Sequence, residues 1–243
     1  MTSKHSPQSP SGPALDRREL LAYTAAFGTA FLAAQGLAGA EDAGAQPERQ
    51  RTPPSGKRYD MKKSINLWAF PYPDKLSLTE CFELAKDAGF DAVEVNYALE
   101  GDLSPEAGDA DFKAIGEAAR RIGIEISGVC SFLFWPYSLT GNDPERRKQG
   151  VELLRKMIAA ARLLGTDNLL VVPGAVYIPW LPEVEPVPND VCLARANEAI
   201  RSVLPDAERH RVFLNMENIF ANAFLMSPQE MNSFVDGFAS RWV

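Results

Sequence analysis

The stretch VFLNMEN, residues 212–218, reads as a short β-strand that ends in a carboxylate. Side chains along a strand alternate between its two faces. One face carries Val212, Leu214 and Met216, and the other carries Phe213, Asn215 and Glu217. An acidic side chain at the end of a buried strand is costly unless it meets a cation or a hydrogen-bond partner, and active sites of parallel α/β folds lie at that end. Glu217 is therefore a candidate functional carboxylate. The alternative is a glutamate that has simply reached solvent.

Composition limits the classes of protein that this chain resembles. Its 243 residues, 46% of them hydrophobic, suffice for one sizeable core and one or two domains. The net charge of −7 and isoelectric point near 5.0 argue against a nucleic-acid partner, because phosphate binding needs a basic face. The cysteines are widely spaced and are expected to be buried thiols: Cys81, Cys130 and Cys192. With only His5 and His210, no histidine-rich metal site is possible in this chain.

The amino terminus has the pattern of an export signal over residues 1–40. An Arg17-Arg18 pair precedes an uncharged run over residues 20–38, and the small-residue site Ala38-Gly39-Ala40 follows. This order predicts export by the twin-arginine route to the periplasm, with membrane contact only through the signal. The competing interpretation is a membrane anchor, which the glycines and polar residues of the run disfavour. Residues 41–60 are predicted to be a flexible tether, and residues 61–243 a single domain.

From residue 64 onward the sequence repeats a unit of strand, loop and helix about every 35–40 residues, which predicts a parallel sheet with right-handed crossovers. The predicted strands cover 64–68, 90–96, 124–130, 168–172 and 212–217, and helices are expected near 78–88, 112–122, 144–164, 191–204 and from 228. An open doubly wound sheet and a (β/α)8 barrel both fit this order. The sequence has neither a G-x-G-x-x-G after the first strand nor a P-loop. Polar residues recur on one face near the strand ends, which favours a barrel mouth: Asn66, Glu94, Asn96, Asn215 and Glu217.

Several segments then carry a family resemblance: AGFDAVE (88–94), RRKQGV (146–151), ARLLG (161–165), MEN (216–218) and FLMSPQE (224–230). With them, residues 65–243 resemble the first five βα units of the xylose isomerase-like TIM barrels. The group most similar is that of the ketose 3-epimerases and hexulose-phosphate isomerases/epimerases. The resemblance implies an α/β fold of (β/α)8 type that is incomplete here, and an isomerase that acts on a sugar.

The resemblance also implies a divalent metal, Mn²⁺, Mg²⁺ or Co²⁺, held by Glu, Asp, His and Glu from strands five to eight. Glu217 matches the first metal ligand and, in epimerases, one of two acid/base glutamates. The metal would hold the enediolate that forms when a proton next to the carbonyl is removed. Ligands from strands six to eight do not follow Glu217 in this sequence. We therefore expect a truncated barrel with impaired activity and with the fifth strand as an open edge.

Three further side chains are candidate sugar contacts. Glu94 is expected to point into the barrel and touch substrate, or else to be neutralised by a local hydrogen bond. Trp68 and Phe134 would wall the sugar pocket, or else pack within their loops. The loop after Cys130 lacks the histidine found there in some phosphosugar epimerases, which favours an unphosphorylated ketose.

Two alternatives to a sugar isomerase remain. A metal-dependent endonuclease on the same barrel would need several histidines and a basic groove, which this sequence lacks. An exported, non-catalytic carbohydrate-binding fragment stays open, as does an oligomeric state.

Overall fold

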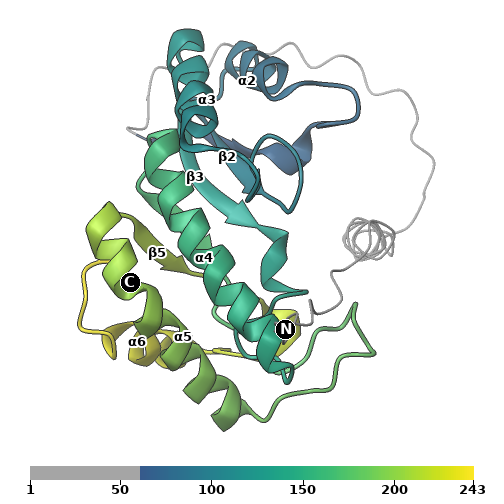
Figure 1. Ribbon diagram of the computed structural model, residues 1–243, viewed down its shortest axis with the longest axis vertical. Helices are drawn as coiled ribbons and strands as arrows, with labels where there is room; N and C mark the ends of the chain where they lie inside the picture. The colour runs from purple at the N-terminus through teal and green to yellow at the C-terminus, as the bar shows by residue number, and fades with distance from the viewer. Residues whose placement is uncertain (1–60) are drawn as a thin grey trace, which may run out of the picture. The chain divides into compact units, whose positions relative to one another are not determined.

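A five-stranded parallel sheet forms the centre of the domain in the computed structural model, which describes residues 61–243 (Figure 1). Its strands are β1 (Ser64–Asn66), β2 (Ala92–Tyr97), β3 (Glu125–Ser131), β4 (Asn168–Val171) and β5 (Phe213–Met216). They pair in chain order, each parallel to the next. The predicted export signal and tether fall on residues 1–60 and so lie outside the described part of the chain.

The helices that connect these strands are α2 (Leu78–Asp87), α3 (Asp109–Ile122), α4 (Pro144–Leu164) and α5 (Asn189–His210), and α6 (Pro228–Asp236) follows β5. Short 3₁₀ turns follow three strands: η1 (Leu67–Ala69), η2 (Phe132–Phe134) and η3 (Phe220–Asn222). Helices α3, α4 and α5 pack against one another in sequence. A strand order equal to the chain order is that of a barrel, whereas a doubly wound sheet reverses direction at a switch point. The prediction of an incomplete TIM barrel is confirmed.

The two faces of the sheet differ as the alternation of the sequence predicted. The outer face is buried beneath the helices, and its side chains are at most 1% exposed: Val93, Val95, Val129, Leu169, Val171 and Leu214. We call the opposite face the inner face. It carries polar side chains that bond to one another across strands, including Glu94 and Asn96.

Most helices begin and end at the residues that the sequence indicated. Ser77 Oγ accepts from the Glu80 N–H, and a Glu80 carboxylate oxygen accepts from the Ser77 N–H, which completes a capping box. Asp143 caps α4 ahead of Pro144. Gly165 ends α4 with φ of 90°, a left-handed conformation that glycine adopts without strain.

Several element boundaries differ from the sequence prediction by two residues or more, and two of them have a physical cause in the structure. Helix α5 was expected to end near residue 204, yet it continues through Pro205 to His210. Val203 and Ala207 are both fully buried, so packing of the last turns outweighs the hydrogen bond that proline removes. Strand β1 is shorter than predicted because the Asn66 side chain accepts from the Trp68 N–H and starts η1.

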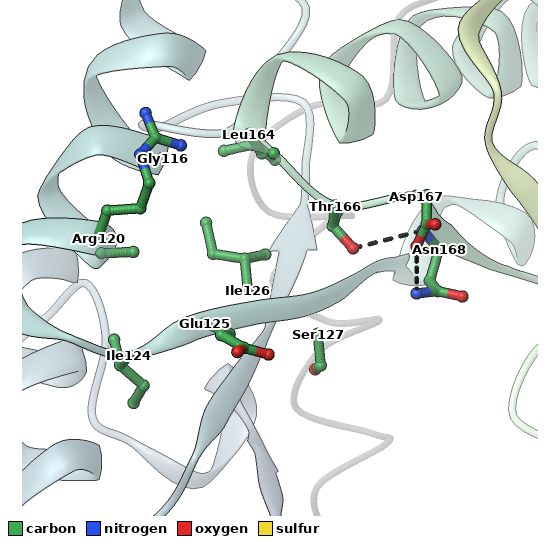
Figure 2. A pocket seen from close by; sticks show the side chains of 12 residues that line it. Gly116, Arg120, Ile124, Glu125, Ile126, Ser127, Leu164, Thr166, Asp167 and Asn168 are labelled. Atoms are coloured by element: carbon green, nitrogen blue, oxygen red, sulfur yellow. Dashed lines mark hydrogen bonds between the residues drawn. The ribbon is translucent and has the colours of Figure 1, made fainter. Parts of the chain in front are cut away.

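A close approach of α3 to α4 borders a hollow at the amino ends of β3 and β4 (Figure 2). A Cβ atom on Gly116 would lie 2.4 Å from the carbonyl oxygen of Leu164, so only glycine permits this approach. The hollow, of about 370 Å³, also contacts Glu125 and Asn168, the first residues of β3 and β4. It therefore lies at the opposite end of the strands from Glu217. Within residues 61–243, none of the helices combines the length and apolar character needed to cross a membrane.

Candidate active site on the inner face

A hydrogen-bonded cluster of polar side chains occupies the inner face of β1, β2 and β3. Nδ2 of Asn66 lies 2.6 Å from Oε2 of Glu94 and 3.3 Å from Sγ of Cys130. The Cys130 thiol in turn donates to Oδ1 of Asn96 at 3.0 Å. Glu94 thus points to the inner face, as predicted, and it is held there by a neighbouring strand.

The orientation of the Asn66 amide is fixed from its other end. Oδ1 of Asn66 accepts from the backbone N–H of Trp68 at 2.8 Å, which identifies the opposite atom, Nδ2, as the donor. The donor can therefore face only the Glu94 carboxylate and the Cys130 sulfur. One short turn after β1 consequently sets the position of a carboxylate on β2.

Glu217 lies one residue beyond β5 and continues its pairing with β4. Its backbone N–H donates to the carbonyl oxygen of Val171 at 2.9 Å, so the backbone at Glu217 keeps the strand register. Burial raises the pKa of the half-buried Glu217 carboxyl, and the negative charge of Glu94 raises it further. No salt bridge within residues 61–243 involves either carboxylate. Two acidic groups from β2 and β5 therefore act on each other without a protein cation between them.

Cys130 is buried, as the sequence predicted for all three cysteines, but it is not surrounded by apolar groups alone. Burial raises the pKa of its thiol, and the charge of Glu94 raises it as well. The thiol is therefore neutral at ordinary pH and acts as a weak hydrogen-bond donor within the cluster.

Asn222 fixes the segment that follows Glu217, and sequence reasoning missed it. Its side chain is 1% exposed, and Nδ2 donates to the Gly174 carbonyl oxygen at 3.0 Å while Oδ1 accepts from the Phe224 N–H at 3.2 Å. Its own carbonyl oxygen accepts from the Val176 N–H at 3.0 Å. The loop after β5 is thereby joined to the loop after β4. No local pattern around residue 222 signals this role, because most of the partners lie about 46–48 residues earlier.

The two predicted aromatic contacts occupy different environments. Trp68 lies in η1 with 55% of its surface exposed, two residues after Asn66, which orients Glu94. Phe134 lies in η2 with 3% exposed, so little of its surface is available to a ligand. A role in sugar binding stays a prediction for both.

The donor set of residues 61–243 does not by itself form a metal centre. In this part of the chain no group of three or more His, Cys, Asp or Glu side chains is arranged to hold a metal ion. Glu217 has the chemistry of one ligand for a hard divalent cation. Since one carboxylate is not a site, the described residues do not fit the metal on their own.

Comparison with known proteins identifies the family. A sequence model of the family described as xylose isomerase-like TIM barrel matches residues 82–243. The chain belongs to this family. Among curated proteins, none matches the chain.

Several solved structures share this xylose isomerase-like fold. A D-psicose 3-epimerase crystallised in the presence of D-fructose is 22% identical, with a TM-score of 0.63 over 75% of this chain and 62% of that one. An L-ribulose 3-epimerase is 20% identical, with a TM-score of 0.61 over 74% of this chain and 58% of that one. A D-psicose 3-epimerase from Clostridium cellulolyticum H10, crystallised with D-tagatose, is 19% identical, with a TM-score of 0.60 over 72% of this chain and 59% of that one. The chain spans 58–62% of the length of these proteins. At such identities the likeness shows the fold.

Proposed function

We propose that this xylose isomerase-like protein is a sugar isomerase or epimerase that removes a proton next to the carbonyl of a ketose, with Glu217 as the base. One observation carries the proposal: Glu217 lies at the carboxyl end of β5, half-buried, with its pKa raised by burial and by Glu94. A carboxylate with a raised pKa is a stronger base, and this property is typical of groups that move protons in catalysis.

The reaction needs more than a base. A proton next to a carbonyl is weakly acidic, and its removal places negative charge on the carbonyl oxygen, which a preorganised positive group must stabilise. Mn²⁺, Mg²⁺ or Co²⁺ would supply that charge, and Glu217 is the described carboxylate that would contact it. The described residues lack a complete ligand set, and their own part in the reaction is the proton transfer to the Glu217 carboxylate.

Two further properties belong to the proposal. The open sheet leaves Asn215 on β5 exposed, and a site that does not exclude water is a poor catalyst. We therefore expect low activity when the five strands act alone. The sequence of residues 1–40 supports export by the twin-arginine route, which suits a free sugar as substrate.

Solvent-hydrogen exchange tests this function directly. The chain is incubated with D-fructose and Mn²⁺ in deuterium oxide, and incorporation of deuterium next to the carbonyl is followed by NMR. We expect slow exchange that Glu217→Gln abolishes and that Glu83→Gln, on the exposed side of α2, leaves unchanged. Sugar binding with no exchange would instead favour the non-catalytic carbohydrate-binding alternative. Exchange that persists in Glu217→Gln would overturn the assignment of the base.

A further inference from the structure

The inner face of β2 presents an acceptor and a donor side by side. Glu94 and Asn96 are two residues apart on one strand, so their Cα atoms are about 7 Å apart and their side chains lie on the same face. Both side chains are half-buried and both belong to the hydrogen-bonded cluster. Their polar groups are therefore held in position before any ligand arrives.

Each of the two side chains keeps hydrogen-bonding capacity. A carboxylate has about four acceptor positions, of which Asn66 takes one at Oε2 and the Cys130 thiol takes at most one more. Asn96 accepts at Oδ1, while its Nδ2 has no hydrogen-bond partner within residues 61–243. Neither Glu94 nor Asn96 has a buried atom left without a partner. The remaining positions are therefore accessible on the inner face.

This arrangement matches the hydroxyl groups of a sugar chain. A hydroxyl group both donates and accepts, so a carboxylate oxygen takes the proton of one hydroxyl while an amide N–H binds the oxygen of the next. Two neighbouring hydroxyl groups, one bonded to Glu94 and the other to Asn96, would span the distance between these two side chains. The charge of Glu94 also raises the pKa of Glu217, so the pair acts electrostatically on the proposed base.

The charge of the cluster further restricts the ligand. Glu94 and Glu217 carry negative charge on this face, and no salt bridge within residues 61–243 neutralises either one. A phosphate group would be repelled here, because like charges in a partly buried site interact strongly.

We propose that Glu94 and Asn96 form a binding site for two neighbouring hydroxyl groups of an uncharged ketose, with Glu94 accepting from one hydroxyl and Asn96 donating to the other. The inference rests on the proposed function, since it assigns the substrate class of the same site. Asn66 is a positioning residue in this site. Its amide, fixed by the Trp68 N–H, holds the Glu94 carboxylate in the orientation that the hydroxyl group meets.

Ligand-observed NMR with the full chain and D-fructose tests the hydroxyl site. Replacement of the charged acceptor by a neutral amide is expected to weaken binding about ten-fold in Glu94→Gln, and loss of the amide donor about five-fold in Asn96→Ala. Matched controls on the helices are Glu83→Gln, which is exposed on α2, and Asn197→Ala, whose amide bonds within α5 to Leu193. Both controls should bind D-fructose like the wild-type chain, and all four variants should keep its melting temperature within a few degrees.

Two comparisons sharpen the result. D-fructose 6-phosphate should bind about ten-fold more weakly than D-fructose, and Glu94→Gln should reduce this difference. Asn66→Ala should weaken D-fructose binding, and the double variant Asn66→Ala/Glu94→Gln should bind no more weakly than Glu94→Gln alone. A purely structural role for Asn66 would give additive losses instead.

The outcomes separate the hydroxyl site from the proposed function. The hydroxyl site is overturned if the wild-type chain does not bind D-fructose or prefers D-fructose 6-phosphate. It is also overturned if the Glu94→Gln and Asn96→Ala variants bind D-fructose as tightly as the wild-type chain. If hydrogen exchange is catalysed and neither variant alters binding, the proposed function stands and the hydroxyl site fails. If both variants weaken binding and no exchange occurs, the hydroxyl site stands and the proposed function fails.

Discussion

The carbonyl oxygen of Trp242 accepts a hydrogen bond of 2.7 Å from the backbone N–H of Leu214. The neighbouring Phe213 N–H points the other way, to Asp167 ahead of β4, so the Trp242 bond lies on the open edge of β5. The rings of Phe213 and Trp242 are 4.9 Å apart between centroids. An open edge presents unpaired backbone groups that favour association with other strands. Trp242 covers part of that edge with both its backbone and its ring.

Trp242→Ala is therefore expected to lower the free energy of unfolding by about 1–2 kcal/mol, through loss of the aromatic pair and of buried ring surface. Denaturant unfolding followed by circular dichroism measures the change. Trp68→Ala is the matched control, because a ring that is 55% exposed should contribute less than about 0.5 kcal/mol. Equal effects of the two substitutions would show that Trp242 does not stabilise the edge.

Glu217 predicts a pH dependence of stability. Its pKa in the folded chain is raised above the ordinary value of 4.5, so folding favours the protonated form. The folded state is consequently penalised as pH rises from 4.5 through the raised pKa, and the penalty is fully present above it. Glu217→Gln should thus stabilise the fold at neutral pH and change little below pH 4.5, as measured by unfolding at both conditions.

The charge of Glu94 contributes to the same shift, so Glu94→Gln should lower the pKa of Glu217 toward its ordinary value. Carbon-13 NMR of the Glu217 carboxyl, labelled selectively, follows the titration. Glu83→Gln, on the exposed side of α2, is the control. A titration that is the same in all three proteins would mean that burial alone sets the shift.

Local patterns were sufficient to predict the polar face of the sheet and the starts of α2, α4 and α6. Glu94 and Asn96 were assigned to the same face because a strand has a period of two residues. The Ser77 capping box was predictable because both of its partners lie within four residues. The carboxyl end of β5 could be predicted in the same way, and with it the candidate base Glu217.

The side-chain contacts between different strands could not be predicted from the sequence. Asn66, Glu94 and Cys130 are separated by 28 and 64 residues along the chain, counted from Asn66. The place of Cys130 in this cluster depends on a register shift between β2 and β3 at Val93 and Glu94, which sets Asn96 opposite Cys130. A bulge of this kind changes which side chains are neighbours, and no periodicity in the sequence reports it.

The close packing of α3 against α4 leaves no room for a side chain at position 116. A Cβ atom there would lie 2.4 Å from the Leu164 carbonyl oxygen, which is backbone and cannot rotate away. We expect Gly116→Ala to destabilise the domain by about 1–3 kcal/mol, even though alanine favours helix formation. Gly141→Ala is the control, since its nearest neighbour would be 3.7 Å away. Thermal unfolding of both variants compares them, and a stable Gly116→Ala would mean that the two helices can separate freely.

Substitutions of Asn222 are expected to destabilise the domain, and the loss of stability in Asn222→Asp is expected to depend on pH. Asn222→Ala leaves the Gly174 carbonyl oxygen and the Phe224 N–H without their partner in a buried region, at a cost of about 1–3 kcal/mol. Asn222→Asp keeps the acceptor for Phe224, but at neutral pH it places a carboxylate oxygen against the Gly174 carbonyl oxygen. Its destabilisation should therefore be at least as large.

The acid form of the aspartate can donate to Gly174 again. The folded state then raises the pKa of that carboxyl, so Asn222→Asp should regain stability relative to the wild-type chain as pH falls through the raised value. Asn222→Ala has no titrating group and should show no such recovery, and Asn232→Ala, exposed on α6, should change little at any pH. Denaturant unfolding across this pH range measures all three variants. Parallel pH profiles for Asn222→Asp and Asn222→Ala would show that the amide bond to Gly174 does not hold the loop that carries Glu217.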